Sequence, residues 1–351
     1  SISLMSQSIL PMPPQEATKI ILKNLPSRRM RDVVEKRFGL RGGGAHTLQA
    51  IGKEYKITRE RVRQIEYDAL KQLRKDEHLQ DVAPVFQAMT AHLATHGGIM
   101  TEQELLASLC DSRYHPHVSL LLDIGPSFHR VAESNDCHQR WAVNKDIAHR
   151  VEKVLDASVK ELEGNKRTVS AEELHGIISR AAKEVHGEHV EDRVIQTLIA
   201  TSKHIHKNPY NEYGLAWWPS INPSGVKDKA YVAIAKAGKP LHFREVAEVI
   251  NKAGWSKKKA HPQTVHNELI KDKRFVLVGR GLYALKEWGY EPGAVRDVIV
   301  SVLKEAGKPL TKDEIVTQAT TKRLVKVPTI LLNLQNKKLF KHLNDGTYTL
   351  V

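Results

Sequence analysis

The stretch TLQAIGKEYKITRERVRQIEYDALKQLRK, residues 47–75, decides the fold of the N-terminal part of the chain. Thr47 and Thr58 each stand where the N-cap of a helix is expected, and Lys56-Ile57 forms the turn between the two helices. Apolar residues recur at helical spacing after each cap, first Leu48, Ile51 and Tyr55, then Val62, Ile65, Ala69, Leu70 and Leu73. The pattern predicts a helix-turn-helix, whose second helix enters the major groove of DNA.

The second helix carries polar residues that suit base recognition. They lie in its first two turns, mainly off the apolar face: Arg59, Glu60, Arg61, Arg63 and Gln64. Arg can bind guanine with two hydrogen bonds, Glu accepts from cytosine, and Gln can pair with adenine. The alternative is an Arg-rich solvated face that binds nothing.

Two segments carry a family resemblance. LPSRRMRDVVEKRFGL (25–40) and the stretch 47–75 resemble region 4 of bacterial primary-type sigma factors, over about residues 22–75. The resemblance implies that this helix reads a −35 promoter element and that the domain docks on the flap of the RNA polymerase β subunit. By position it implies that Arg59, Glu60 and Gln64 face bases, that Arg61 and Arg63 meet backbone or neighbouring bases, and that Thr47 meets a phosphate.

Composition and charge agree with a nucleic-acid partner. The chain has 351 residues and a formal net charge of +14, with 41% hydrophobic and 27% charged residues. Residues 16–75 and 226–351 are basic, whereas residues 76–225 carry 14 Lys and Arg against 21 Asp and Glu. Basic ends can neutralise phosphates, and an acidic centre favours protein contact. A surplus of Lys that serves only solubility is the alternative for the C-terminal end.

A repeat follows the helix-turn-helix. A cap residue with Glu three positions later occurs at Thr101, Ser170, His242 and Thr311, in steps of about 70 residues. Each unit has a helix before this cap, further helical sequence after it, and two strand-like runs that include an aromatic residue. This order predicts four tandem winged helices, each with a small two-stranded wing.

The third unit carries the second resemblance. GKPLHFREVAEVINKAGW (238–255) and HPQTVHNELIKDKRFVLVGRGLYALKEWGY (261–290) resemble the HARE-HTH domain over roughly residues 226–290. That family includes the N-terminal domain of the RNA polymerase delta subunit and also occurs in restriction enzymes and chromatin proteins. Four cations of this unit are candidate DNA contacts: Lys257, Lys258, Lys259 and Arg280. In the last unit we expect phosphate contacts from Lys322, Arg323, Lys326, Lys337 and Lys338, with protein contact as the alternative.

We therefore expect a mainly α protein, with an N-terminal helix-turn-helix followed by four tandem winged-helix units. The expected divisions are a flexible tail at 1–15, a sigma region 4-like domain at 16–78, winged helices at 79–145 and 146–222, a HARE-HTH winged helix at 226–290 and a last winged helix at 291–351. No run of residues is apolar and long enough to span a bilayer. The two cysteines suit a reducing cytoplasm.

The sequence predicts a binding protein rather than an enzyme. It has no phosphate-binding loop, no G-x-S-x-G and no carboxylate cluster for two-metal chemistry. The group Cys110, His115, His117, Cys137 and His138 lacks the paired spacing of structural zinc sites. We expect no cofactor or metal, double-stranded DNA and RNA polymerase as partners, and a cytoplasmic (nucleoid) location. The expected role is a sigma- or delta-like accessory factor without its own −10 melting helix; the alternative is the DNA-recognition component of a restriction or defence system.

Overall fold

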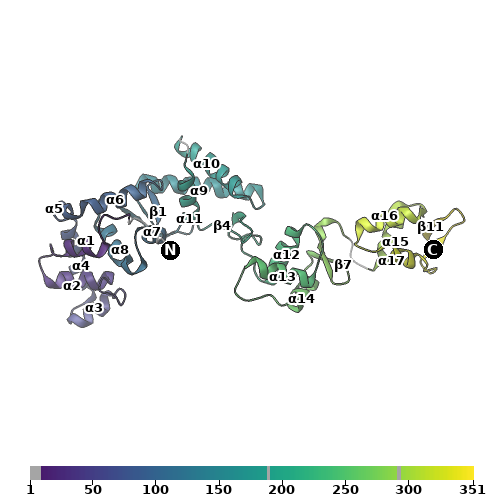
Figure 1. Cartoon of the computed structure of the whole chain (residues 1–351), viewed down its shortest axis with the longest axis horizontal. Helices are drawn as coiled ribbons and strands as arrows, with labels where there is room; N and C mark the ends of the chain where they lie inside the picture. The colour runs from purple at the N-terminus through teal and green to yellow at the C-terminus, as the bar shows by residue number, and fades with distance from the viewer. Residues whose placement is uncertain (1–8, 188–189, 291–293) are drawn as a thin grey trace, which may run out of the picture. The chain divides into compact units, whose positions relative to one another are not determined.

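The computed structural model describes residues 9–187, 190–290 and 294–351, which form a mainly helical protein with small antiparallel sheets (Figure 1). The helical class predicted from the sequence is confirmed. Contacts divide the chain into two compact bodies, residues 1–206 and residues 207–351, each with buried apolar cores of its own. None of the described helices is both long and apolar enough to cross a lipid bilayer.

The helix-turn-helix module consists of α1 (Pro14–Leu22), α2 (Arg28–Phe38), α3 (Leu48–Tyr55) and α4 (Arg59–Leu73). The ends of its helices are set by local capping interactions. The Ser27 hydroxyl accepts from the main-chain N–H of Met30 and starts α2, five residues after α1 ends. Gly39 ends α2 in the left-handed conformation, with φ of 72°.

Residues 10–15 belong to the folded body and not to a tail. Leu10 is 4% exposed and packs in the same core as Leu22 and Leu25. Helix α1 begins at Pro14, whose fixed φ suits a first helical turn. The expectation of a flexible tail at 1–15 is therefore wrong from Leu10 onward, because the Leu10 side chain packs in the apolar core. Residues 1–8 of the expected tail lie outside the described part of the chain.

The first repeat unit adds helices and a three-stranded sheet. After the short α5 (Asp76–Leu79) and the 3-10 turn Gln80–Val82, its elements are α6 (Ala83–Ala94), β1 (Ile99–Thr101), α7 (Glu102–Leu109), the 3-10 turn Ser112–Tyr114, α8 (His115–Ile124), β2 (His129–Val131) and β3 (Arg140–Ala142). The strands pair antiparallel in the order β1-β3-β2.

Helix α8 joins this unit to the helix-turn-helix module. It contacts α1, α2 and α4 of the module and α7 of its own unit (Figure 1). Val118, Leu121 and Ile124 of α8 are fully buried, and a single apolar core runs from Leu10 to Trp141. The predicted boundary near residue 78 therefore does not separate two independent cores.

The second repeat unit comprises α9 (Lys145–Asn165), α10 (Ala171–His186), α11 (Asp192–Thr201) and the two-stranded sheet of β4 (Ile205–Lys207) and β5 (Tyr213–Leu215). Its helix α11 packs against β1 of the first unit. The residues after α11 hold the first unit's β2–β3 loop: Lys203 Nζ lies 2.5 Å from the Glu133 carboxylate, and His204 Nε2 lies 2.8 Å from that of Asp136.

The third and fourth units repeat the order of the first. The third has α12 (Val226–Ala237), β6 (Leu241–His242), α13 (Phe243–Ala253), α14 (Pro262–Lys271), β7 (Phe275–Gly279), β8 (Leu282–Leu285) and the 3-10 turn Lys286–Trp288. The fourth has α15 (Val295–Ala306), β9 (Leu310–Thr311), α16 (Lys312–Lys322), α17 (Val327–Leu334), β10 (Phe340–His342) and β11 (Thr347–Leu350). Each unit has its own buried cluster.

The sheets contain one strand more than the predicted two-stranded wing. In the first, third and fourth units a short strand that ends at the cap residue pairs with the last strand of the hairpin, so the sheet has three strands. The cap residues themselves behave as predicted. Ser170, His242 and Thr311 form capping boxes with the Glu three positions later. At Thr101 the hydroxyl accepts from the Glu104 N–H and donates to its carboxylate.

Candidate nucleic-acid interface

Helix α4 is fixed against α3 by a tight turn. Lys56 adopts the left-handed conformation with φ of 55°, and the Thr58 hydroxyl accepts from the Arg61 N–H at 3.1 Å. A Cβ on Gly52 would lie 2.8 Å from the carbonyl oxygen of Ile57, so only glycine allows this approach. The predicted turn and cap are confirmed.

The buried face of α4 matches the pattern read from the sequence. Val62 and Ile65 pack with Val33 and Ile51, whereas Ala69 and Leu73 enter the larger core shared with α8. Leu70, predicted on this face, is only partly buried against that core. With this side of the helix held on two cores, the face that carries Arg59, Glu60 and Arg61 is exposed.

The exposed residues of α4 differ in how they are engaged within the protein. The side chains of Arg59 and Arg61 make no hydrogen bond or ion pair with any described residue. Arg63 donates to both carboxylate oxygens of Glu60, with Nη2 to Oε1 at 2.6 Å, and this contact lowers the Glu60 pKa. Gln64 Nε2 donates to Asp68 Oδ1 at 2.9 Å. The first two arginines can meet DNA at once, whereas Glu60, Arg63 and Gln64 must exchange an intramolecular partner for a base or phosphate.

Thr47 also has a structural role. Its hydroxyl accepts from the Ala50 N–H at 3.1 Å and caps α3. The hydroxyl hydrogen is still available to donate, so the capping role is compatible with the predicted phosphate contact.

Other arginines of the module hold its helices together, a role that sequence reasoning missed. Arg37 Nε donates to Glu66 of α4 at 3.0 Å, and Arg31 Nε donates to the Leu22 carbonyl oxygen at 3.0 Å. Arg74 donates from Nε and Nη2 to the carbonyl oxygen of Asp123, at 3.2 and 3.1 Å. A count of net charge cannot separate these cations from those that are available to phosphates.

Asp32 is the centre of a second structural network. Its carboxylate accepts from the Tyr55 hydroxyl and pairs with Lys36 Nζ at 2.7 Å and Arg41 Nη1 at 2.8 Å. Burial raises the Asp32 pKa, but the hydrogen bonds and the positive charge of Lys36 outweigh it and hold the pKa below the ordinary value. This network fixes α2 against α3 and uses two of the module's cations.

In the third unit the predicted DNA contacts lie at two exposed loops. Lys257, Lys258 and Lys259 follow α13 in the loop to α14, and Arg280 lies in the turn between β7 and β8. All four side chains are exposed. Arg274 is engaged within the unit, where its Nη2 bridges Asp228 at 2.7 Å and Asp272 at 2.6 Å.

Helix α14 adds two polar residues that sequence reasoning missed. Gln263 and Asn267 are exposed and one turn apart, with Gln263 Nε2 lying 3.3 Å from Asn267 Oδ1. On the other side of the helix Val265 and Leu269 are buried. Amide side chains in such a row can pair with adenine edges. Their spacing four residues apart, opposite two buried apolar residues, is the signal that could have revealed them.

In the first unit, the helix and the hairpin loop that correspond to α14 and the β7–β8 turn make contacts within the protein. Its third helix, α8, is buried against α1, α2 and α4, and the loop of its hairpin is held by Lys203 and His204. Neither element is free to enter a DNA groove. This agrees with the protein-contact interpretation of the acidic centre.

In the last unit two predicted phosphate contacts are engaged within the fold. Lys322 Nζ lies 2.5 Å from the Glu305 carboxylate, and Arg323 is buried. Lys326, Lys337 and Lys338 are exposed as expected. The prediction is therefore wrong for Lys322 and Arg323, because the first binds α15 and the second packs into the unit.

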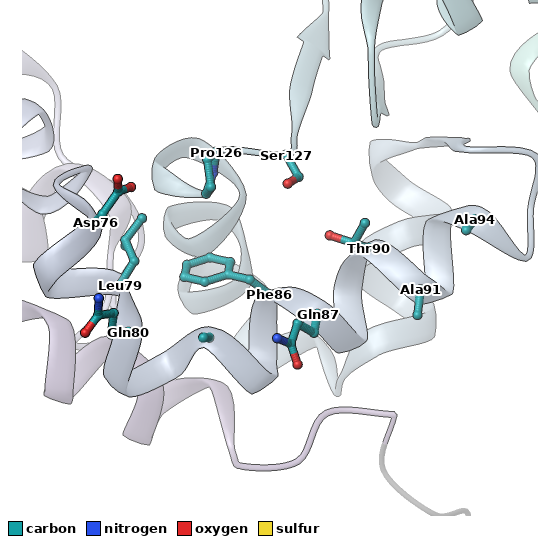
Figure 2. Close-up of a pocket in the computed structure, with 11 residues that line it drawn as sticks. Asp76, Leu79, Gln80, Phe86, Gln87, Thr90, Ala91, Ala94, Pro126 and Ser127 are labelled. Atoms are coloured by element: carbon teal, nitrogen blue, oxygen red, sulfur yellow. The ribbon is translucent and has the colours of Figure 1, made fainter.

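The described residues contain no group of three or more His, Cys, Asp or Glu side chains placed to hold a metal. His117, one of the residues weighed as a zinc ligand, instead contacts the Thr18 hydroxyl at 2.7 Å. An open hollow of about 600 Å³ lies along α6. Figure 2 shows Leu79, Phe86 and Pro126 around it, with Asp76 at its edge. Among the described residues that line it, Asp76 is the one charged side chain, so the hollow offers no acid–base pair for catalysis.

Comparison with known proteins locates two families within the chain. Residues 21–75 match the family model for sigma-70, region 4. Residues 226–288 match that for HARE-HTH, a helix-turn-helix domain named in part for ASXL proteins and restriction endonucleases. Both resemblances found in the sequence are confirmed, with nearly the predicted limits.

Several curated relatives, all RNA polymerase sigma factors, match short stretches of the chain. The RNA polymerase sigma factor SigA of Lactococcus lactis subsp. cremoris is 54% identical over 46 residues, 13% of each chain. SigA of Clostridium acetobutylicum is 52% identical over 54 residues, 15% of this chain and 14% of that protein. RpoD of Neisseria gonorrhoeae is 46% identical over 59 residues, 17% of this chain and 9% of that protein. The chain thus spans only a small part of these sigma factors, which supports a DNA-binding, transcription-related module.

Proposed function

We propose that this protein is a bacterial sequence-specific DNA-binding transcription factor that reads −35-type promoter DNA through α4. The observation that carries the proposal is the exposure of Arg59 and Arg61 on the helix of a module that matches sigma-70 region 4. Glu60 and Gln64 lie in the same two turns and supply an acceptor and an amide for base edges.

The repeat units support the DNA binding of α4 and add contacts to it. We propose that the four repeat units are winged helices, and that the third contacts DNA through the Lys257–Lys259 loop, Arg280 and the amides of α14. The first serves as a support for the helix-turn-helix module, because its third helix is buried there. The proposed location is the cytoplasm, on the nucleoid.

The proposed partner is RNA polymerase, with the β flap as its docking site by resemblance to sigma region 4. The proposed role is that of an accessory factor, which acts at the promoter together with a second sigma factor. Run-off transcription with core polymerase tests this. We expect no defined start without a second sigma factor and a changed start-site yield when one is added; robust initiation by this protein alone would refute the accessory role.

A second candidate is the DNA-recognition component of a restriction or defence system. The observation that favours it is the match of residues 226–288 to a domain named in part for restriction endonucleases. Binding to core polymerase separates the two candidates. Retention of purified core polymerase by the immobilised full chain supports the transcription role, whereas tight DNA binding without any polymerase retention supports the second candidate.

A further inference from the structure

The solvent side of α4 carries a single row of side chains. An α-helix has 3.6 residues per turn, so residues three or four apart lie on the same side of it. The buried residues of α4 follow this spacing: Val62, Ile65, Ala69 and Leu73. On the opposite side of the helix a second set follows it: Glu60, Gln64, Tyr67 and Lys71. We call this second set the α4 outer row.

Tyr67 is the aromatic member of the α4 outer row. Its side chain is 53% exposed, and among the described aromatic residues Trp217 is the other exposed one. The Tyr67 side chain makes no hydrogen bond, ion pair or ring contact with any described residue. A large part of the ring's apolar surface therefore stays in water, and a partner that covers it gains free energy from its burial.

The α4 outer row continues the proposed base-reading surface without a break. Glu60 and Gln64, its first two members, are the acceptor and the amide proposed for base edges. Tyr67 follows Gln64 by three residues, which is about 4.5 Å along the helix axis. Because a DNA duplex rises about 3.4 Å per base pair, Tyr67 reaches about one base pair beyond Gln64. Lys71, exposed one turn further along, adds positive charge for the phosphates.

The chemistry of the row suits DNA better than a protein partner. Besides Tyr67 its members are polar, so the row offers a protein a single apolar side chain, whereas protein interfaces have an apolar core of several. A base edge requires the opposite mixture. The major groove presents donors and acceptors together with one apolar group, the methyl group of thymine, and apolar side chains recognise thymine by contact with that methyl group.

We infer that Tyr67 is a specificity-determining residue whose ring contacts the methyl group of a thymine about one base pair beyond the base read by Gln64. The contact extends the sequence read by α4 into the third turn of the helix. This inference rests on the proposed reading of DNA by α4, and it adds to that function a named residue and a named base.

Replacement of thymine by deoxyuridine tests the contact, because it removes only the methyl group. Binding-site selection with the full wild-type chain supplies the duplex, and each of its thymines is then replaced in turn. We expect one replacement to weaken wild-type binding about threefold to fivefold, the effect of one buried methyl group.

Three variants assign that effect to a residue. Tyr67→Ala should bind the thymine duplex about threefold to fivefold more weakly than the wild type and lose nothing further when uracil replaces that thymine. Tyr67→Phe, which keeps the ring, should keep the uracil penalty. Lys160→Ala, on the exposed surface of α9, should behave as the wild type. Tyr67 is exposed, so circular dichroism should report unaltered folding for its variants.

Several outcomes would overturn the inference while α4 remains the reader. One is a selected motif in which no uracil replacement weakens wild-type binding. Another is a Tyr67→Ala chain with the same uracil penalties as the wild type. Equal weakening of Tyr67→Ala on every duplex would make Tyr67 a backbone contact, and loss of core-polymerase retention with unaltered DNA binding would assign it to a protein.

Failure of the proposed function itself has a different signature. The wild-type chain would then enrich no motif, or Arg59→Ala combined with Gln64→Ala would enrich the same motif as the wild type. Either result would remove α4 as the reader and the Tyr67 contact with it. A motif that depends on Gln64 but shows no coupling between Tyr67 and a thymine methyl group would overturn the inference alone.

Discussion

Gln64 Nε2 donates a hydrogen bond to Asp68 Oδ1 at 2.9 Å, one turn further along α4. The amide proposed to read a base is therefore held by a carboxylate in the free protein. A base edge must compete with that carboxylate, and the carboxylate also adds negative charge close to the proposed path of the phosphates. DNA binding through α4 thus carries a local cost that a single substitution can remove.

The variant Asp68→Ala should bind duplex DNA more tightly than the wild type. It removes the competing acceptor and one negative charge, which together should favour binding by about 0.5–1.5 kcal/mol. Anisotropy titrations at several salt concentrations measure this change. Asp156→Ala, which breaks an exposed pair with Lys160 on α9, is the matched control and should leave the affinity unaltered. Weaker binding by Asp68→Ala would show that Asp68 instead positions Gln64 for recognition.

Glu60→Gln tests whether the carboxylate of Glu60 reads a base. Because its pair with Arg63 is exposed, its loss should leave stability nearly unaltered. The variant should bind random DNA more tightly through its extra net positive charge, yet lose about 1–3 kcal/mol of discrimination at one base pair. Binding-site selection measures the discrimination. An unaltered preference at every position would remove Glu60 from the set of base contacts.

Leu121→Ala tests the shared core of the first body. Leu121 is fully buried in α8, so the substitution should destabilise the body by about 2–5 kcal/mol. Because α8 packs on α1, α2 and α4, hydrogen exchange should accelerate in α4 as well as in α8. Acceleration confined to residues 83–142, with α4 as protected as before, would contradict a shared core.

Acid should weaken the third unit through Asp272. Hydrogen bonds from Arg274 hold the pKa of Asp272 below its ordinary value. A lowered pKa means that the stabilisation is complete above the unfolded pKa of about 4 and is lost as pH falls through the folded value. Asp272→Asn should therefore cost about 1–3 kcal/mol at pH 7 and reduce the loss of stability below pH 4. Urea unfolding followed by Trp fluorescence measures both; an unaltered pH dependence would exclude Asp272 as its source.

Local signals in the sequence were sufficient for the helix-turn-helix. Thr58 caps α4 and Gly39 ends α2 because capping and left-handed glycine depend on a few neighbouring residues. The same holds for the cap residues Ser170, His242 and Thr311, whose regular spacing in the sequence predicted the repeat units.

Long-range contacts account for what the sequence could not predict. Strands β6 and β9 have two residues each, too few for an alternating pattern, and form only because the last strand of a hairpin is beside them. The role of Arg74 depends on Asp123, 49 positions away. Leu332 is exposed and Leu334 is buried, although both are leucines on one helix. Such differences are set by packing, which a residue's own neighbours in sequence do not determine.

The central claim is that α4 reads DNA bases, and binding-site selection from random duplexes tests it most directly. The wild-type chain should enrich a single short motif, and Arg59→Ala combined with Gln64→Ala should lose preference at the contacted positions, at about 1–3 kcal/mol for each lost contact. Lys160→Ala, on the exposed surface of α9, should enrich the same motif as the wild type. An identical motif from the double variant and the wild type would contradict the account.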